Sequence, residues 1–523
     1  MTLTRQTYEE LERIVGAANV SDEPSVLDSY AWRSGLGGGA RRFVPRFEAI
    51  VLPAGTTEVQ AIVRLCNREG LQYKASSTGW GFMSDPGGPC VIKIDLRRMN
   101  RILDIDEENM YAVVQPYVIG AQLQAELMKR GLTCNVTGAG GNCSALPLAA
   151  HEGIGHMGQS LSYSERNLLA LEWVTPEGDV VRLGSLGSTG DWFCGDGPGP
   201  SLRGIVRGHT TPLGGFGVYT AAAQKIYHWP GPPTVPVKGT SPHYVAQLPP
   251  GFLIRYLSFA SPERRFEALR KIGESEIAAE IMGFTASMVA ANMATSNDED
   301  AVLDERLRAA VIGPGFQVIV IGDSPRDFDY KSRVLEQISQ EPGAASLDLV
   351  EDTEIGAAML WRCVRITGSI RETLRAGGVF GGVVGGTDQV ELLAEYIAAT
   401  AEVKAELIRR DVVLDDGKEP CVTSLEHGHF GHAELLVRHQ PVAEAGAGMA
   451  ELMDVAVKYG ATHRLGVPHF VGGDRLHDVF GPVSSNYHTW LRGIKRAFDP
   501  NESSEASNYV TFTGSKGETT DGE

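Results

Sequence analysis

The stretch PAGTTEVQAIVRLCNREGLQYKASSTGWG, residues 53–81, contains the clearest structural signal in the chain. After a threonine pair, apolar residues recur at the spacing of one helical face, at Val59, Ile62, Val63 and Cys66. This spacing predicts a helix that begins behind a capping threonine and stops at Gly70. LQYKASS then predicts a strand, and TGWGF predicts a tight turn whose two glycines allow positive φ angles.

The sequence on both sides of this stretch is equally regular. EAIVLP before it and VIKIDL, RILDID and MYAVVQP after it predict strands, and GAQLQAELMKRG predicts a helix. LLALEWVTPEGDVVRLG, residues 168–184, predicts a hairpin around a Pro-Glu-Gly turn. One β-α-β start followed by a β-meander favours an α+β fold over a doubly wound parallel sheet.

A Pro-rich segment, HWPGPPTVPVKGTSP at residues 228–242, indicates a domain boundary. Beyond it, long amphipathic helices alternate with strands to about residue 460, and HTWLRGIKRAFDPNE predicts one last helix closed by an Asp-Pro pair. We therefore predict a first domain at 1–235, a second domain at 236–462, and a return to the first domain at 463–523, which ends in a polar tail.

Composition limits the classes of function. The chain has 523 residues, 42% apolar and 21% charged, which is typical of a soluble protein with more than one domain. Its net charge of -18 argues against nucleic acid and against an anionic membrane surface as partners. Seven scattered cysteines without a C-x-x-C pair, and the absence of a signal peptide or a long apolar run, predict a reduced, cytoplasmic protein.

Several segments resemble known metal-binding or nucleotide-binding motifs but do not have the required residues at the required spacing. HEGIGH, residues 151–156, has one residue too many for a zinc-protease HExxH, and its glycines weaken a helix there. GAGGNC, residues 138–143, lacks the third glycine and the strand-to-helix setting of a dinucleotide fingerprint, and no Walker loop is present.

A histidine cluster, LEHGHFGHAELLVRH at 425–439, is the densest group of titratable residues. On a strand, His427 and His429 would share one face, and His432 and Glu434 would share the other parity. One interpretation is a polar strand along a wet cleft, with histidines bonded to water or backbone. The other, which we favour, is an active-site strand. We expect no metal; an ion on His429, His432 and Glu434 is the minor alternative.

Arg464 follows His463 in YGATHRLGVPHF, among small and apolar residues. A guanidinium in such a setting pairs either with a structural carboxylate or with an anionic substrate or a developing anion. Both interpretations stay open from the residues alone.

Together these motifs resemble the vanillyl-alcohol oxidase family of flavoproteins, with its PCMH-type FAD-binding domain. Four blocks in the right order carry the resemblance: residues 53–81, the meander VIKIDLRRMNRILDIDEENMYAVVQP, PLAAHEGIGHMGQSLSYSERNLLALEWVTPEGDVVRLG, and GPGPSLRGIVRGHTTPLGGFGVYTAAAQKIYHWP. The terminal IKRAFDPNE is similar to the family's last helix. The resemblance implies a two-part FAD-binding domain and a substrate (cap) domain built on an antiparallel sheet flanked by helices. It also implies a homo-oligomer.

FAD is the cofactor that this resemblance implies. A glycine-containing loop can hold its pyrophosphate through backbone N–H groups, so an acidic protein needs no cationic side chain for it. Gly214 and Gly215 belong to a second stretch where the backbone would approach the cofactor. The residues expected to bind it are Ser76, Ser77, Thr78, Gly79, Trp80, Gly81, Phe82, Pro116, His151, Gly153, Gly155, His156, Gly158, Gly217 and Val218.

The resemblance is nearest to the branch that acts on 4-substituted phenols. That branch has Ser-Gly-Tyr-Gly in the loop and a later Tyr-Arg pair to hold the phenolate; the matching residues here are Trp80, His463 and Arg464. The loop contains no histidine and VFGGVVGG, residues 379–386, contains no histidine or tyrosine, so we expect non-covalent FAD. NVTGAGG also lacks the family's acid near flavin N5.

These features imply an FAD-dependent oxidase or dehydrogenase that takes a hydride from a benzylic or carbinol C–H of a small, oxygenated substrate. The expected catalytic residues are Arg464, His463, Trp80, His427 and His429. One alternative is a metal-dependent 2-hydroxy-acid dehydrogenase, because GHFGHAEL distantly resembles the metal-binding strand of D-lactate-type members. Another is a flavin-binding protein without catalytic activity.

Overall fold

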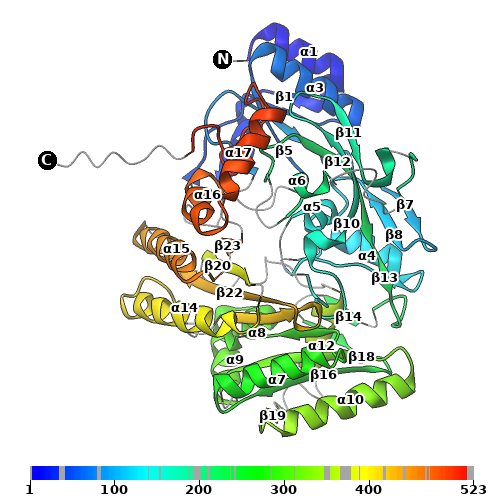
Figure 1. The fold of residues 1–523 in the computed structure, drawn as a ribbon, viewed down its shortest axis with the longest axis vertical. Helices are drawn as coiled ribbons and strands as arrows, with labels where there is room; N and C mark the ends of the chain where they lie inside the picture. Colours follow the sequence, from blue (N-terminus) through cyan, green and yellow to red (C-terminus); the bar gives the residue numbers. More distant parts are fainter. Residues whose placement is uncertain are drawn as a thin grey trace, which may run out of the picture.

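The structure is a computed structural model of the chain (Figure 1). It describes residues 3–33, 42–78, 84–138, 140–151, 155–187, 189–192, 202–208, 212–235, 237–240, 243–283, 285–310, 313–346, 354–365, 379–387, 389–415, 420–439, 443–465, 468–469 and 472–514.

The first part of the chain forms a small mixed sheet covered by a helix. Its strands have the order β1 (Val20–Ser21), β4 (Ala49–Val51), β6 (Val91–Asp95) and β5 (Gln72–Ser76), and β4, β6 and β5 are parallel. Helix α3 (Thr56–Glu69) lies where the sequence predicts it and ends at Gly70 in the left-handed region, φ +65°. The predicted threonine cap is wrong: Gly55 occupies that position, and the Thr56 hydroxyl donates instead to Glu172 at 2.6 Å.

A five-stranded antiparallel sheet follows. The predicted hairpin is confirmed, because Val174 pairs with Val180 around the Pro-Glu-Gly turn. Sheet and helix side chains enclose a core that includes Val114, Leu171 and Trp173. The strands, in sheet order, are β11 (Val180–Leu183), β10 (Leu168–Val174), β12 (Val218–Lys225), β8 (Tyr111–Val114) and β7 (Ile102–Asp106).

The larger sheet in the described part of the chain belongs to the second half. Helices α7 (Pro262–Glu274), α10 (Pro325–Gln340) and α14 (Leu392–Arg409) cover one face, and α12 (Glu354–Arg365) packs on the other with residues from the first half (Figure 1). Its eight strands, in order, are β19 (Ala345–Ser346), β16 (Phe252–Ser258), β18 (Gly315–Ile321), β17 (Glu280–Met282), β21 (Cys421–Leu425), β22 (Phe430–His439), β20 (Val379–Thr387) and β23 (Pro468–His469).

The chain then returns to the first half of the structure, which contains the small mixed sheet and the five-stranded sheet. Helices α16 (Asp474–Phe480) and α17 (Tyr487–Phe498), red in Figure 1, follow, and Leu491, Ile494 and Phe498 of α17 pack against the core of the five-stranded sheet. Beyond α17, Ser504 forms a parallel bridge with Tyr73 of β5. Segments from both ends of the sequence are thus paired in this part of the structure.

The remaining described elements connect or flank these sheets. They are α1 (Arg5–Val15), α2 (Pro24–Ala31), α4 (Gly120–Met128), α5 (Ala145–Ala150), α6 (Arg203–Val206), α8 (Ala286–Met293), α9 (Asn297–Ala310), α15 (Ala443–His463), β2 (Trp32–Arg33), β3 (Arg42–Phe43), β9 (Leu132–Thr133), β13 (Tyr227–His228), β14 (Val237–Thr240) and β15 (His243–Ala246).

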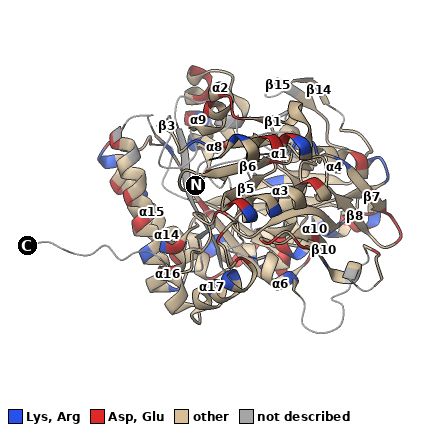
Figure 2. Cartoon of the chain, turned by 90° about the horizontal axis from the view of Figure 1, so that it is seen from above, with Lys and Arg blue, Asp and Glu red and all other residues tan. Residues whose placement is uncertain are grey.

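The surface carries charges of both signs. Figure 2 shows acidic and basic positions interspersed along the helices of this view, for example on α1 and α15. Across the described residues, no helix has the combination of length and apolar character needed to cross a membrane.

Candidate cofactor and substrate site

A cavity of about 230 Å³ lies between the two sheets of the first half. One wall follows the end of β5, at Ala75, Ser76, Ser77 and Thr78. β5 runs parallel to β6 and ends where this loop begins, so the loop lies at the carboxyl end of the strand. Hydroxyl groups and backbone therefore line this side, and the apolar Leu96 lines the cavity as well.

The loop before β12 forms a second wall of the cavity. Gly214 and Gly217 line the cavity and have φ angles of +81° and +79°. A Cβ on Gly217 would lie 2.4 Å from the carbonyl oxygen of Val174, so only glycine fits. A Cβ on Gly214 would lie 3.1 Å from the carbonyl oxygen of Ala75, so this loop lies directly against the β5 wall.

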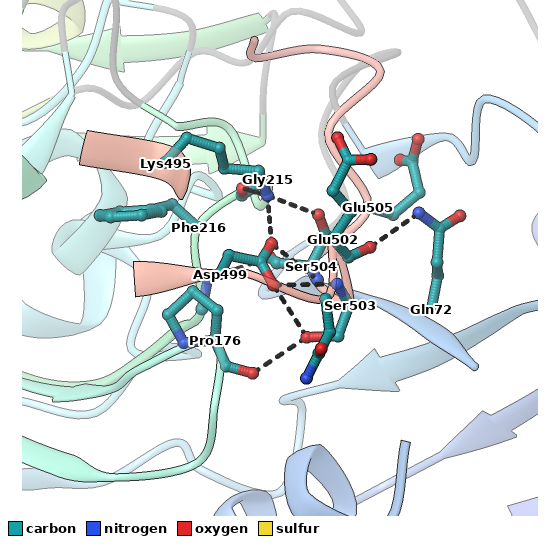
Figure 3. Close-up of polar contacts among 12 residues, drawn as sticks. Gln72, Pro176, Gly215, Phe216, Lys495, Asp499, Glu502, Ser503, Ser504 and Glu505 are labelled. Atoms are coloured by element: carbon teal, nitrogen blue, oxygen red, sulfur yellow. Dashed lines mark hydrogen bonds and ion pairs between the residues drawn. The ribbon is translucent and has the colours of Figure 1, made fainter. Parts of the chain in front are cut away.

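A buried ion pair supports the second wall from behind (Figure 3). Lys495 and Asp499 are fully buried and bonded to each other, and the Lys495 ammonium also donates to the carbonyl oxygens of Gly215 at 2.8 Å and Ser504 at 2.9 Å. Asp499 in turn accepts from the backbone N–H of Ser503 at 2.9 Å. A second buried pair, Lys74–Glu505 at 2.6 Å, joins the same C-terminal segment to β5.

The cavity brings together seven of the residues predicted to bind the cofactor, from four separate stretches of sequence. These are Ser76, Ser77, Thr78, Pro116, His151, Gly217 and Val218. Gly79, Trp80, Gly81, Phe82 and Gly153 lie outside the described residues.

Three other predicted residues lie away from this cavity. A Cβ on Gly155 would overlap the side chain of Asn135, and a Cβ on Gly158 would lie 2.2 Å from Leu425 of β21, so the positions are closely packed. His156 Nδ1 lies 2.8 Å from Glu280 Oε1. In the structure the residues from Gly155 to Gly158 pack between the first half and the larger sheet, and their contact with the cofactor stays a prediction.

The histidine cluster differs from the sequence expectation. Glu426 to Gly428 form a single turn of 3₁₀ helix, His427 has a left-handed φ of +58°, and β22 begins only at Phe430. The prediction that His427 and His429 share a strand face is therefore wrong, because the chain reverses at Gly428, φ +90°. His429 is exposed, and the catalytic roles of both histidines stay predictions.

His432 and Glu434 do share a strand face, as predicted. His432 Nε2 lies 3.2 Å from Glu434 Oε1, with the imidazole fully buried and the carboxylate 19% exposed. The exposed His429, which precedes the strand, is not part of this contact. The pair forms an imidazole–carboxylate contact, and an ion on His429, His432 and Glu434 stays the minor alternative.

This pair belongs to a polar row that crosses the larger sheet. In antiparallel strands, directly opposed residues lie on the same face of the sheet. His432 of β22 is opposite Thr423 of β21, and Thr423 is opposite Met282 of β17. Glu280, two residues before Met282, lies on that same face and contacts His156 of the first half. The polar row, defined as Glu280, Thr423, His432 and Glu434, thus faces the first half of the chain.

His463 and Arg464 lie at the C-terminal end of α15. His463 stacks on Tyr459 with ring centroids 3.8 Å apart, and Arg464 ends the helix with φ +55°. Both are exposed and neither lines the cavity described above. Their contact with a substrate stays a prediction.

His156, Glu280 and Cys363 form a buried group at the junction of the two halves, with potential ligand atoms within 4.8 Å of one another. These atoms are already engaged, since His156 bonds Glu280 and the amide of Gln317 donates to the Cys363 sulfur at 2.9 Å. Burial alone would lower the pKa of His156, but the interactions with Cys363 and Glu280 outweigh it and raise the pKa to about 10.

The raised pKa of His156 predicts a pH-dependent contribution to stability. A histidine whose pKa rises on folding stabilises the native state fully below its unfolded pKa of about 6.5, and loses this contribution as the pH rises through the folded pKa. We expect the free energy of unfolding of the wild type to fall between about pH 6.5 and 10. Urea unfolding of wild type and His156→Gln across this range measures it: the variant should lack this part of the slope, and parallel curves would contradict the assignment.

Sequence reasoning missed the residues that support the site from behind. Lys495 was detectable, because it lies on the apolar stripe of α17 with Leu491 and Phe498, and Asp499 follows it by four residues. Glu280 and Cys363 carried no local signal, since their partner His156 lies 124 and 207 positions away in sequence.

Comparisons with known proteins agree with this geometry. Residues 47–184 match the family model of the FAD binding domain. The 1'-carboxy-chondrochloren decarboxylase of Chondromyces crocatus is 32% identical over 178 residues, covering 33% of this chain and 31% of that protein. A D-lactate dehydrogenase of Anaerostipes hadrus is 23% identical over 483 residues, covering 87% of this chain and 88% of that protein. The chain thus spans about a third of the first relative and most of the second.

The fold has a counterpart among solved structures. The structure of p-cresol methylhydroxylase with substrate bound has a TM-score of 0.76 and 17% identity, covering 97% of this chain and 98% of that chain. This likeness confirms the α+β, PCMH-type fold expected from the sequence.

The chain therefore carries an FAD-binding domain, and FAD is its cofactor. The cavity residues fit this group: the hydroxyls and backbone of Ser76 to Thr78 suit a pyrophosphate, while Leu96, Leu148 and Val218 offer apolar surface to ring systems.

Proposed function

We propose that this chain is an FAD-dependent oxidoreductase of the vanillyl-alcohol oxidase type, acting on a benzylic or carbinol C–H of a small oxygenated substrate. Residues 1–235 and 463–523 hold the cofactor, non-covalently, and residues 236–462 cover the substrate. The observation that carries the proposal is the position of the polar row, which faces the half that contains the cavity. FAD supplies the two-electron oxidation when it is bound.

The chain's own residues handle the substrate's proton and oxygen. His432 is held by Glu434 at 3.2 Å, an arrangement in which a carboxylate orients an imidazole. His432 in this role accepts the proton of the substrate hydroxyl. His427, His429 and His463 remain the alternative bases, and Trp80 and Arg464 remain candidates to bind the substrate's oxygen.

A 2-hydroxy acid is the second candidate substrate. It is favoured by the match to a D-lactate dehydrogenase over 87% of this chain, whereas the structural likeness to p-cresol methylhydroxylase favours an alkylphenol. The two substrates differ in charge at neutral pH, because the hydroxy acid carries a carboxylate that needs a cationic or metal partner.

We predict that the purified protein is yellow and that its flavin absorbance bleaches without oxygen when a substrate is added. Bleaching by 4-alkylphenols or benzylic alcohols supports the first substrate class, and bleaching by 2-hydroxy acids supports the second. Acid precipitation should leave the colour in the supernatant. A colourless protein would contradict the proposal, and so would a flavin that is reduced by none of the 4-alkylphenols, benzylic alcohols and 2-hydroxy acids.

The identity of the base is tested on the same assay. We expect His432→Gln to slow bleaching by about 10²–10⁴-fold, the usual contribution of a general base, and Glu434→Gln to slow it less. His429→Gln is the matched change in the preceding turn. If it slows bleaching more than His432→Gln does, the base lies in the turn rather than on the strand.

A further inference from the structure

We propose that Ser504, in the C-terminal segment, is a positioning residue for the FAD site: its hydroxyl sets the cavity wall formed by Gly214 and Gly217. Ser504 is fully buried and lies outside the segment of residues 47–184 that matches the FAD-binding family model. The inference rests on FAD binding and is independent of the substrate.

The hydroxyl of Ser504 makes two bonds to the cavity wall. It accepts from the backbone N–H of Gly217 at 3.0 Å and donates to the carbonyl oxygen of Gly214 at 3.3 Å. Both glycines line the cavity with left-handed φ angles, so one side chain joins the two left-handed positions of this loop. A loop whose backbone must approach a ligand closely depends on such bonds for its geometry.

Ser504 is itself fixed from both sides (Figure 3). Its N–H donates to Asp499 at 3.2 Å, and its carbonyl oxygen accepts from the Lys495 ammonium at 2.9 Å. The bridge between Ser504 and Tyr73 places the same residue beside β5, the strand that leads into the other wall. Ser504 therefore links the two walls of the cavity, although it does not itself line the cavity.

The neighbouring Ser503 provides a matched control. It is also buried, at 3% exposure, and its hydroxyl also makes two bonds, to the carbonyl oxygen of Pro176 and to Asp499, each at 3.0 Å. Neither Pro176 nor Asp499 lines the cavity. Ser503→Ala therefore removes two hydrogen bonds from the same segment, neither of them to a residue that lines the cavity.

The experiment compares Ser504→Ala with Ser503→Ala in the full-length holoprotein. FAD affinity is measured from the flavin fluorescence that dilution releases, together with the flavin content of the protein as purified. Thermal unfolding of each variant reports folding. We expect Ser504→Ala to weaken FAD binding by about tenfold relative to Ser503→Ala, the factor for hydrogen bonds worth ~1.4 kcal/mol, with similar melting temperatures of the FAD-free forms.

Equal FAD binding by the two variants, or weaker binding by Ser503→Ala, overturns the proposal and leaves Ser504 with a role in folding alone. If Ser504→Ala is insoluble, Ser504→Cys is judged by the same comparison with Ser503→Cys, because a thiol keeps the side-chain shape but bonds more weakly. Loss of substrate turnover with normal FAD binding would bear on the proposed function and count against the role of Ser504.

Discussion

Replacing Lys495 by methionine is expected to lower the free energy of unfolding by about 3–5 kcal/mol, because the change leaves the Asp499 carboxylate buried without its counter-ion. Both side chains have 0% exposure, and burial lowers the pKa of Lys495, opposed by Asp499. The lost ammonium also leaves the carbonyl oxygens of Gly215 and Ser504 without their donor. Urea unfolding of the full-length protein measures the effect.

Two further variants make this result interpretable. Lys129→Met removes a lysine from an exposed pair with Glu126, 57% and 44% exposed, and should cost about 0–1 kcal/mol. Lys495→Met combined with Asp499→Asn leaves no buried charge, so it should recover part of the stability lost in the single variant. A single variant as stable as Lys129→Met would show that the buried pair contributes little.

Replacing Gly217 by alanine is expected to destabilise the protein by about 2–6 kcal/mol and to abolish tight FAD binding. The left-handed φ of +79° costs a residue with a side chain about 1–3 kcal/mol, and forced overpacking adds about 1–3 kcal/mol. The overpacking is unavoidable because the new Cβ would lie 2.4 Å from the carbonyl oxygen of Val174 and 2.5 Å from the indole nitrogen of Trp173. Thermal unfolding and flavin content measure the two effects.

Gly204→Ala is the control for this change. Gly204 lies in α6, where an added Cβ meets no atom within 4 Å, so the substitution should be neutral or slightly stabilising. A Gly217→Ala protein with normal flavin content would mean that the loop before β12 relaxes without disturbing the cofactor cavity.

Several helices and strands could be predicted from the sequence, because the pattern that indicates each of them lies within a few residues. The apolar stripe of α3, the strand β5 and the hairpin of β10 and β11 each follow from spacing within a few residues. The loop that begins at Ser77 and lines the cavity was predictable for the same reason, since it directly follows the strand β5.

The error at His427 and His429 has an equally local cause. Strand alternation was extended through Glu426 to His429, where the structure has a turn centred on the left-handed His427 and Gly428. Gly428 was the available signal, because a glycine between polar residues inside a strand pattern favours a bend.

The sequence alone thus determined the α+β class and one wall of the cavity, since each depends on contacts between near neighbours, whereas the FAD-binding segment was expected from the resemblance to a known family. The tertiary structure decided which distant residues complete the site. Ser504 meets Gly217 across 287 positions, and Glu280 meets His156 across 124. Such pairs are set by which strands lie side by side, and packing of whole sheets, rather than any local pattern, selects that order.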